Sequence, residues 1–143
     1  QHYVGLQQRR KQAGMPTMMD TMNSPIHYHP MLKVFANGHQ VAVPANIGID
    51  PTKDPMQMAG LHTHDTSGTI HVEGARRATL DKLFKIWGVP LSSQQLGPYH
   101  AAGRKALRMW VNGKPSRAFG ALKLADRQRI TISFGTDSRP PNG

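Results

Sequence analysis

Residues 61–73 constrain the fold of this chain more strongly than any other stretch. They read Leu-His-Thr-His-Asp-Thr-Ser-Gly-Thr-Ile-His-Val-Glu, with β-branched residues on both sides of a Ser-Gly pair. β-Branched residues favour strands, and a glycine-containing pair between two such runs is typical of a hairpin turn. The sequence therefore predicts a β-hairpin whose two central turn residues are Ser67 and Gly68.

The predicted pairing gathers polar side chains on one face of this hairpin. In this register His64 pairs with His71, and two residues further from the turn His62 pairs with Glu73. Side chains alternate between the faces of a strand, so these side chains project from the same face. Opposed Cβ atoms lie about 4.5–5.5 Å apart, close enough for two imidazoles to bind one ion. A one-residue change of register would divide the group between two faces.

A second histidine pair precedes the hairpin in the chain. His27 and His29 lie two residues apart in the strand-like stretch 26–35, and they therefore share a face. Pro30 has no N–H group for a sheet ladder, so the residues before it are expected to form an edge or a separate short strand. We expect this pair to join the same ion. The candidate metal ligands are thus His62, His64, His71, Glu73, His27 and His29.

The residue types favour copper, with zinc as the alternative. Imidazole and carboxylate suit Cu²⁺ and Zn²⁺ better than they suit Mg²⁺ or Ca²⁺, although non-haem iron with two histidines and one carboxylate stays open. The chain has no cysteine, which excludes disulfides, thiolate-zinc sites and iron–sulfur clusters. Residues 15–22 contain four methionines, whose thioethers suit Cu⁺. The same methionines would also pack well against the domain or a neighbour.

The length predicts one domain with appended ends. A chain of 143 residues can form one modest core. Residues 1–25 read as an extended, Met-rich basic arm, with a short polar helix open within residues 1–12. Residues 26–136 read as a single β-rich domain that carries the histidine cluster, and residues 137–143 read as a tail.

One amphipathic helix is predicted after the central hairpin. Thr79 suits its N-cap, and Gly88 suits the position just after its end. The apolar side chains between them recur at helical spacing and form one stripe: Leu80, Leu83, Phe84 and Trp87.

Hairpins on either side of this helix define the predicted fold class. Asn-Gly pairs at 37–38 and 112–113 predict two further hairpins, and residues 118–124 and 130–134 predict short strands. We therefore expect an α+β fold, with a mixed, mostly antiparallel β-sheet and one amphipathic helix packed across it, as in the β-grasp. A small β-barrel with the helix as a plug is the alternative.

The excess of basic over acidic residues indicates which kinds of partner the chain could bind. The formal net charge is +10, which favours an anionic surface such as nucleic acid, acidic lipid, a cell-wall polymer or an acidic protein. The basic residues are dispersed, and no helix-turn-helix, aromatic RNA-binding or zinc-finger pattern accompanies them. We expect no specific nucleic-acid recognition. No apolar run reaches the roughly 20 residues of a transmembrane helix.

Three motifs carry a resemblance to a known family. They are His-Tyr-His at 27–29, LHTHDxSGxIHVE at 61–73 and LDKLFKIWG at 80–88, with Asn-Gly hairpins on either side. Together they resemble a largely uncharacterised family of small exported bacterial and archaeal proteins, over most of residues 26–134. The resemblance implies export and a histidine-based site but no reaction. With the cysteine-free composition and a first residue that is not Met, it predicts a secreted, periplasmic or extracellular protein.

Three functional hypotheses follow. The first is an exported metal-binding protein that holds copper, or zinc, in the histidine cluster. The second is a structural or accessory subunit of an extracellular or membrane-bound assembly, in which residues 1–25 wrap a neighbouring subunit or mediate self-assembly. The third is a metal hydrolase or oxygenase with one open coordination position. No nucleophile elbow or phosphate-binding glycine loop is present, so the sequence leans against an enzyme.

Overall fold

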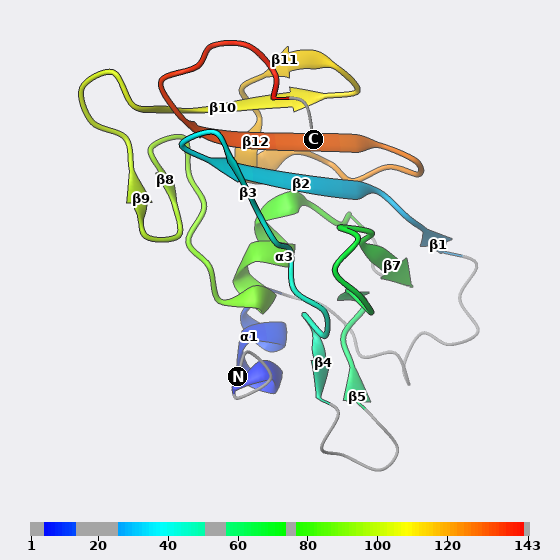
Figure 1. Cartoon of the computed structure of the whole chain (residues 1–143). Coiled ribbons are helices and arrows are strands. Elements are labelled where there is room, and N and C mark those ends of the chain that lie inside the picture. Colours follow the sequence, from blue (N-terminus) through cyan, green and yellow to red (C-terminus); the bar gives the residue numbers. More distant parts are fainter. Residues whose placement is uncertain (1–4, 14–25, 51–56, 74–76, 142–143) are drawn as a thin grey trace.

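A five-stranded mixed sheet forms the upper layer of the molecule in Figure 1. The structure is a computed structural model, and it describes residues 5–13, 26–50, 57–73 and 77–141. The strand order is β11-β10-β12-β2-β3, with β2 and β12 parallel and the other neighbours antiparallel. The strands are β2 (Met31–Ala36), β3 (His39–Val41), β10 (Ala106–Val111), β11 (Lys114–Ser116) and β12 (Arg129–Gly135).

Two tight turns connect the outer strands of this sheet to their neighbours. Asn37 and Gly38 join β2 to β3 with φ angles of 52° and 84°, and Asn112 and Gly113 join β10 to β11 with φ angles of 52° and 83°. Positive φ at both central residues is the geometry of the type I′ turn, which asparagine followed by glycine adopts readily. Both Asn-Gly hairpins predicted from the sequence are therefore confirmed.

Helix α3 (Leu80–Trp87) lies below the five-stranded sheet in the view of Figure 1. Thr79 is its N-cap residue, and Gly88 ends it with a left-handed φ of 85°. The helix buries Leu80, Leu83, Phe84 and Ile86 in the core. The predicted helix is thus confirmed, and Ile86 extends its buried surface beyond the predicted stripe.

A second helix, α1 (Leu6–Gln12), packs against α3. Leu6 is only 2% exposed, and the Arg9 Nε–H group donates a hydrogen bond of 2.7 Å to the Ile86 carbonyl. The short polar helix considered for residues 1–12 is therefore present and docked on the domain. The methionine cluster at 15–22 lies outside the described residues, as does most of the segment predicted to wrap a neighbour.

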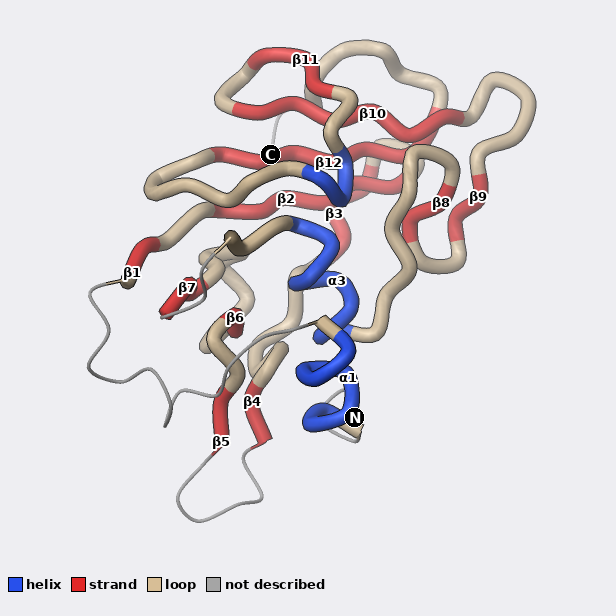
Figure 2. The backbone as a smooth tube through the Cα atoms, turned by 180° about the vertical axis from the view of Figure 1, so that it is seen from behind, coloured by secondary structure: helices blue, strands red, loops and turns tan. Residues whose placement is uncertain are grey.

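A small three-stranded sheet lies beside the helices (Figure 2). Its strands are β1 (His27–Tyr28), β6 (Leu61–His62) and β7 (His71–Glu73), in the order β1-β7-β6. Two further antiparallel pairs are β4 (Ile49–Asp50) with β5 (Gln57–Met58), and β8 (Gln95–Leu96) with β9 (Tyr99–His100). The isolation of β1 from β2 matches the effect expected of Pro30.

The predicted α+β class is confirmed, and the barrel alternative is wrong. Among the described strands the large sheet ends at β3 and β11 and does not close. The more specific β-grasp assignment stays a prediction. Within the described ranges, no helix combines the length and the apolar character needed to cross a membrane.

One predicted strand is replaced by other structure. Residues 118–124 contain the 3₁₀ turn η1 (Phe119–Ala121), and Phe119 has a φ of 45°. The Phe119 side chain is buried in the core, and its backbone N–H faces the sulfur of Met109 at 3.2 Å. Burial of this aromatic ring curls the chain where alternation alone predicts an extended strand.

Candidate metal centre

The three-stranded sheet brings all six predicted ligands into one patch. Its central strand β7 contributes His71 and Glu73. On one side Glu73 is paired with His27 of β1, and on the other His71 is paired with His62 of β6. The two remaining histidines, His29 and His64, each lie two residues after the histidine of a flanking strand and contact His71.

The register of the central hairpin differs from the prediction. His62 pairs with His71 and Leu61 pairs with Val72, whereas the two-residue turn predicts His62 opposite Glu73. The connection therefore covers residues 63–70 rather than two residues. The shift amounts to two positions, and because side chains alternate with a period of two, every predicted ligand keeps its face.

The longer connection exists because its residues bond to other parts of the chain. The Leu32 N–H donates to the Gly68 carbonyl at 2.8 Å, and the Ile70 N–H donates to the Pro30 carbonyl at 2.8 Å. Gly68 has a φ of +86°, and a Cβ atom there would lie 2.2 Å from the Leu32 oxygen. This close backbone approach holds the start of β7 beside residues 29–32.

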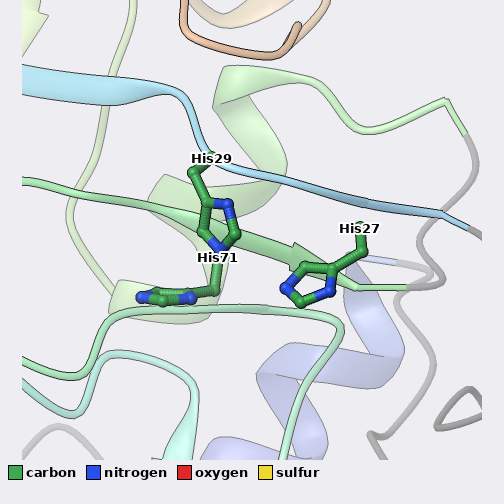
Figure 3. Close-up of side chains that lie close together, drawn as sticks. All are labelled: His27, His29 and His71. Carbon is green, nitrogen blue, oxygen red and sulfur yellow. The ribbon is translucent and has the colours of Figure 1, made fainter.

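Five imidazole rings, including that of His71, form one network of contacts centred on His71. Its ring centroid is 4.6 Å from that of His29 and 4.6 Å from that of His64, in both cases edge to face. His62 stacks on it at 5.4 Å with an interplanar angle of 3°. His27 completes the group through His29 at 4.8 Å. Figure 3 shows the rings of His27, His29 and His71 converging from two separate strands.

His62 forms the buried floor of the patch. Its side chain is fully buried, and its Nδ1 atom lies 2.7 Å from the Ala59 carbonyl oxygen. A carbonyl oxygen only accepts, so Nδ1 carries the hydrogen and Nε2 carries the lone pair. The Nε2 atom is buried and has no hydrogen-bond partner among the described residues. A ring held by a backbone carbonyl through one nitrogen, with the other nitrogen free, is the arrangement typical of metal-binding histidines.

Glu73 places the only carboxylate of the predicted set against two of these rings. It is also the only glutamate in the sequence. Its Oε1 atom lies 3.4 Å from His62 Nε2 and 3.9 Å from His27 Nε2. With the hydrogen of His62 on Nδ1, two electron-rich atoms face each other, and a cation between them would turn this contact into an attraction.

The surroundings keep the inner histidines neutral. Burial, followed by the neighbouring His62, His64 and His29, lowers the pKa of His71 to about 4, while Glu73 opposes the shift. Burial also lowers the pKa of His62, against the hydrogen bond that His62 donates to the Ala59 carbonyl and the charge of Glu73. Metal ions bind the neutral imidazole, so both rings are ready to ligate at neutral pH.

Neighbouring polar residues hold the connection between the two strands in place. The Thr63 hydroxyl donates to the Pro44 carbonyl at 2.8 Å and accepts from the Ile47 N–H at 3.1 Å. The Asp65 carboxylate accepts from the backbone N–H of Ser67 at 3.0 Å, which is the turn contact expected for aspartate at this position. These bonds fix the backbone on both sides of His64.

The arrangement meets the basic geometric need of a metal site. Two groups of three histidines have potential ligand atoms within 4.8 Å of one another, and they are His27, His29 and His71, and His62, His64 and His71. The role of the Ala59 carbonyl was not predicted from the sequence. No signal could reveal it, because every residue has a carbonyl and only the fold decides which one meets a histidine.

Comparison with protein families, curated proteins and solved structures adds no relative. No family model, no curated protein and no solved structure matches the chain.

Proposed function

We propose that this protein binds a copper ion in the histidine cluster of its three-stranded sheet, with zinc as the alternative ion. The proposal assigns to the cluster the task of taking up and holding the ion. The candidate ligands are His27, His29, His62, His64, His71 and Glu73.

The observation that carries this proposal is the position of His62 Nε2 beside Glu73. Two ligands bonded at roughly 2.0–2.1 Å to a tetrahedral ion lie roughly 3.4 Å apart. The Nε2 and Oε1 atoms are 3.4 Å apart, and Nε2 is buried without a hydrogen-bond partner in the part of the chain that the structure describes. An unsatisfied buried nitrogen costs roughly 1–3 kcal/mol. A bound cation would remove this cost and relieve the repulsion from the carboxylate.

The choice of copper follows from the donor set. Five imidazole nitrogens and one carboxylate surround the patch, and no thiolate is available because the chain has no cysteine. Among divalent first-row ions, Cu²⁺ binds such nitrogen-rich sites most tightly, and Zn²⁺ is weaker. Selectivity for copper would therefore follow from affinity alone if both ions were present at equal concentration.

The exposure of the ligands supports reversible uptake. The side chain of His27 is 56% exposed and that of His62 is 0% exposed. His64 is exposed as well. An ion can therefore reach the outer histidines from solvent, whereas the inner ring of His62 is buried beneath them.

Calorimetric titration of metal-free protein with Cu²⁺ and with Zn²⁺ tests the proposal. We expect tight binding by the unchanged chain. The double variant His62→Ala/His64→Ala should lose at least about 10–100-fold in affinity, since changes to residues that merely support ligands already cost this much. The double variant His39→Ala/His100→Ala is the matched control, because both histidines are exposed and lie on β3 and β9.

The two double variants give opposite results if the proposal is right. Equal affinities in the unchanged chain and in His62→Ala/His64→Ala would overturn it. Loss of affinity in His39→Ala/His100→Ala would assign the binding to other histidines and would overturn it equally.

We further propose an extracytoplasmic location for this copper site. The resemblance of residues 27–29, 61–73 and 80–88 to exported proteins supports it, together with a cysteine-free sequence. Fractionation of the native source with an antibody to the chain provides the test, and recovery from the cytosol alone would contradict this part of the proposal.

A further inference from the structure

The histidine cluster has an internal symmetry that a single metal ion would not use. The central strand β7 carries His71 and Glu73, and each flanking strand leads into a His-x-His pair. One pair is His27 and His29, on the β1 side. The other is His62 and His64, on the β6 side. The two pairs therefore approach β7 from its two opposite edges.

His71 belongs to both histidine groups. Its ring contacts His29 on one side and His64 on the other, each at 4.6 Å. Each group of three has potential ligand atoms within 4.8 Å of one another, and both groups include His71. The two nitrogens of an imidazole point away from each other, so one ring cannot offer both to the same ion. One ring can, however, offer one nitrogen to each of two ions.

Glu73 stands between the same two histidine pairs. Its Oε1 atom lies 3.9 Å from the Nε2 atom of His27 and 3.4 Å from the Nε2 atom of His62. A carboxylate has two oxygens and can bind two cations at once, as in two-metal sites. Both polar residues of the central strand are thus placed to be shared.

The number of candidate ligands is larger than one four-coordinate ion can bind. A single four-coordinate ion would leave two of the six candidate residues unused. Two ions that share His71 would each have three histidine ligands, and Glu73 lies beside one histidine of each group. The first set would be His27, His29 and His71, and the second His62, His64 and His71.

We propose that the cluster is a dinuclear site, in which His71 bridges two metal ions held by the two flanking histidine pairs and Glu73 lies between these pairs. This inference rests on the proposed metal-binding function and adds a second ion to it. Both nitrogens of His71 become available once the ring gives up its remaining N–H proton to solvent. The bridged ring is then an imidazolate, and its negative charge together with that of Glu73 lowers the repulsion between the two cations.

The stoichiometry of metal-loaded protein is the first test. Metal-free full-length chain is loaded with Cu²⁺ or Zn²⁺, freed of excess by gel filtration and examined by native mass spectrometry. We expect two ions per chain in the unchanged protein and in the His39→Ala/His100→Ala control. We expect one ion per chain in His27→Ala/His29→Ala, in which neither altered residue is fully buried. His64→Ala removes an exposed residue from the other half and should weaken binding of one ion at least tenfold.

Magnetic coupling is the second test, because it reports the bridge itself. Two Cu²⁺ ions joined by an imidazolate couple antiferromagnetically, so the doubly loaded chain should show less than half of the low-temperature EPR intensity of two isolated ions. His27→Ala/His29→Ala with one Cu²⁺ should show the full intensity of one. A stoichiometry of one ion in the unchanged chain, or two ions with full intensity, would overturn the dinuclear proposal and leave the metal-binding proposal standing. Absence of any bound ion would overturn both.

Discussion

His62 donates its Nδ1 hydrogen to the carbonyl oxygen of Ala59 across 2.7 Å, and this single bond decides which of its nitrogens faces the cluster. The bond joins residues three positions apart, at the turn that leads into β6. It leaves Nε2 as a buried lone pair beside Glu73. The same residue is thus a structural element of the metal-free fold and the floor of the proposed site.

This double role predicts different stability effects for two neighbouring histidines. His62→Ala removes a fully buried ring and leaves the Ala59 carbonyl without its partner. We expect the metal-free protein to lose about 2–4 kcal/mol of unfolding free energy, from the cavity and from the unpaired oxygen. His64→Ala removes an exposed ring and should change it by less than about 0.5 kcal/mol.

Urea unfolding in the presence of a chelator measures both effects on the unfolding free energy. Both variants should lose metal affinity although only one loses stability. Equal destabilisation of the two variants would contradict the assignment of His62 as the buried floor.

The low pKa of His71 predicts an acid-sensitive metal-free protein. In the folded chain the pKa of His71 is lowered to about 4, whereas histidine in an unfolded chain titrates near about 6.5. Between these values the unfolded state binds more protons, so the stability contributed by neutral His71 is fully present above about pH 6.5 and is lost as the pH falls towards 4. The lowered pKa of His62 acts in the same direction.

The measurement is urea unfolding at a series of pH values from 7.5 to about 4.5, with a chelator present. In His71→Ala the decrease of unfolding free energy across this range should be smaller than in the unchanged chain. His100→Ala, an exposed histidine of β9, should keep the full decrease. Identical slopes in the unchanged chain and in His71→Ala would refute the role given to His71.

Alternation of side chains made the face of the site predictable although the register was wrong. The prediction opposed His62 to Glu73, and the structure opposes it to His71. A shift of two residues preserves the face, so the grouping of His62, His64 and His71 did not depend on the turn. The Asn-Gly hairpins and α3 were predictable for a similar reason, because each depends on a local signal within about ten residues.

The parts that escaped prediction depend on contacts between distant residues. The connection 63–70 is long because Gly68 and Ile70 bond to the backbone around Pro30, nearly forty positions earlier. Backbone N–H and carbonyl groups are the same at every residue, so no side-chain pattern reveals such a pairing. The approach of β1 to β7, which unites the two histidine pairs, is of this kind, and so is the docking of α1 on α3.

The contact between Gly68 and Leu32 predicts a steric effect of one methyl group. In Gly68→Ala the new Cβ would lie 2.2 Å from the Leu32 oxygen, at a residue whose φ is +86°. We expect the unfolding free energy to decrease by about 1–3 kcal/mol more than in Gly113→Ala, because overlap with backbone adds to the strain of positive φ. Gly113 has a φ of +83° with no atom within 4 Å of its would-be Cβ, so it isolates the strain alone.

Thermal or urea unfolding gives the comparison between the two glycine variants. A matched metal titration should show weaker binding in Gly68→Ala only, because this contact holds β7 beside His29. Equal stability losses in the two variants would show that the close approach to Leu32 is not a constraint.

The packing of α1 on α3 predicts that the folded unit begins before residue 26. Leu6 is buried in the main core cluster. Leu6→Ala should therefore decrease the unfolding free energy by about 2–4 kcal/mol, the usual cost of removing a buried leucine side chain. Gln8→Ala, an exposed change on the same helix, should stay within about 0.5 kcal/mol of the unchanged protein. A negligible effect of Leu6→Ala would mean that residues 1–25 form an arm independent of the domain.

The last prediction separates direct binding of metal by Glu73 from a general effect of its charge. Glu73→Gln keeps the size of the side chain but removes the anionic oxygen that lies 3.4 Å from His62 Nε2. Asp65→Asn removes an equal charge from an exposed carboxylate that interacts electrostatically with His71 and His64, and asparagine can keep the turn contact with Ser67. If Glu73 is a ligand, Glu73→Gln should lose about 10–100-fold in affinity for Cu²⁺ and Zn²⁺.

Asp65→Asn should then lose far less, because a charge exposed to water is strongly screened. Titrations of the two variants at low and at high salt complete this comparison. A ligand bond should keep the loss in Glu73→Gln nearly constant with ionic strength, whereas a purely electrostatic contribution should shrink towards that of Asp65→Asn as salt increases. Similar, salt-sensitive losses in both variants would remove Glu73 from the set of ligands. The five histidines would then remain as the candidate ligands among the described residues.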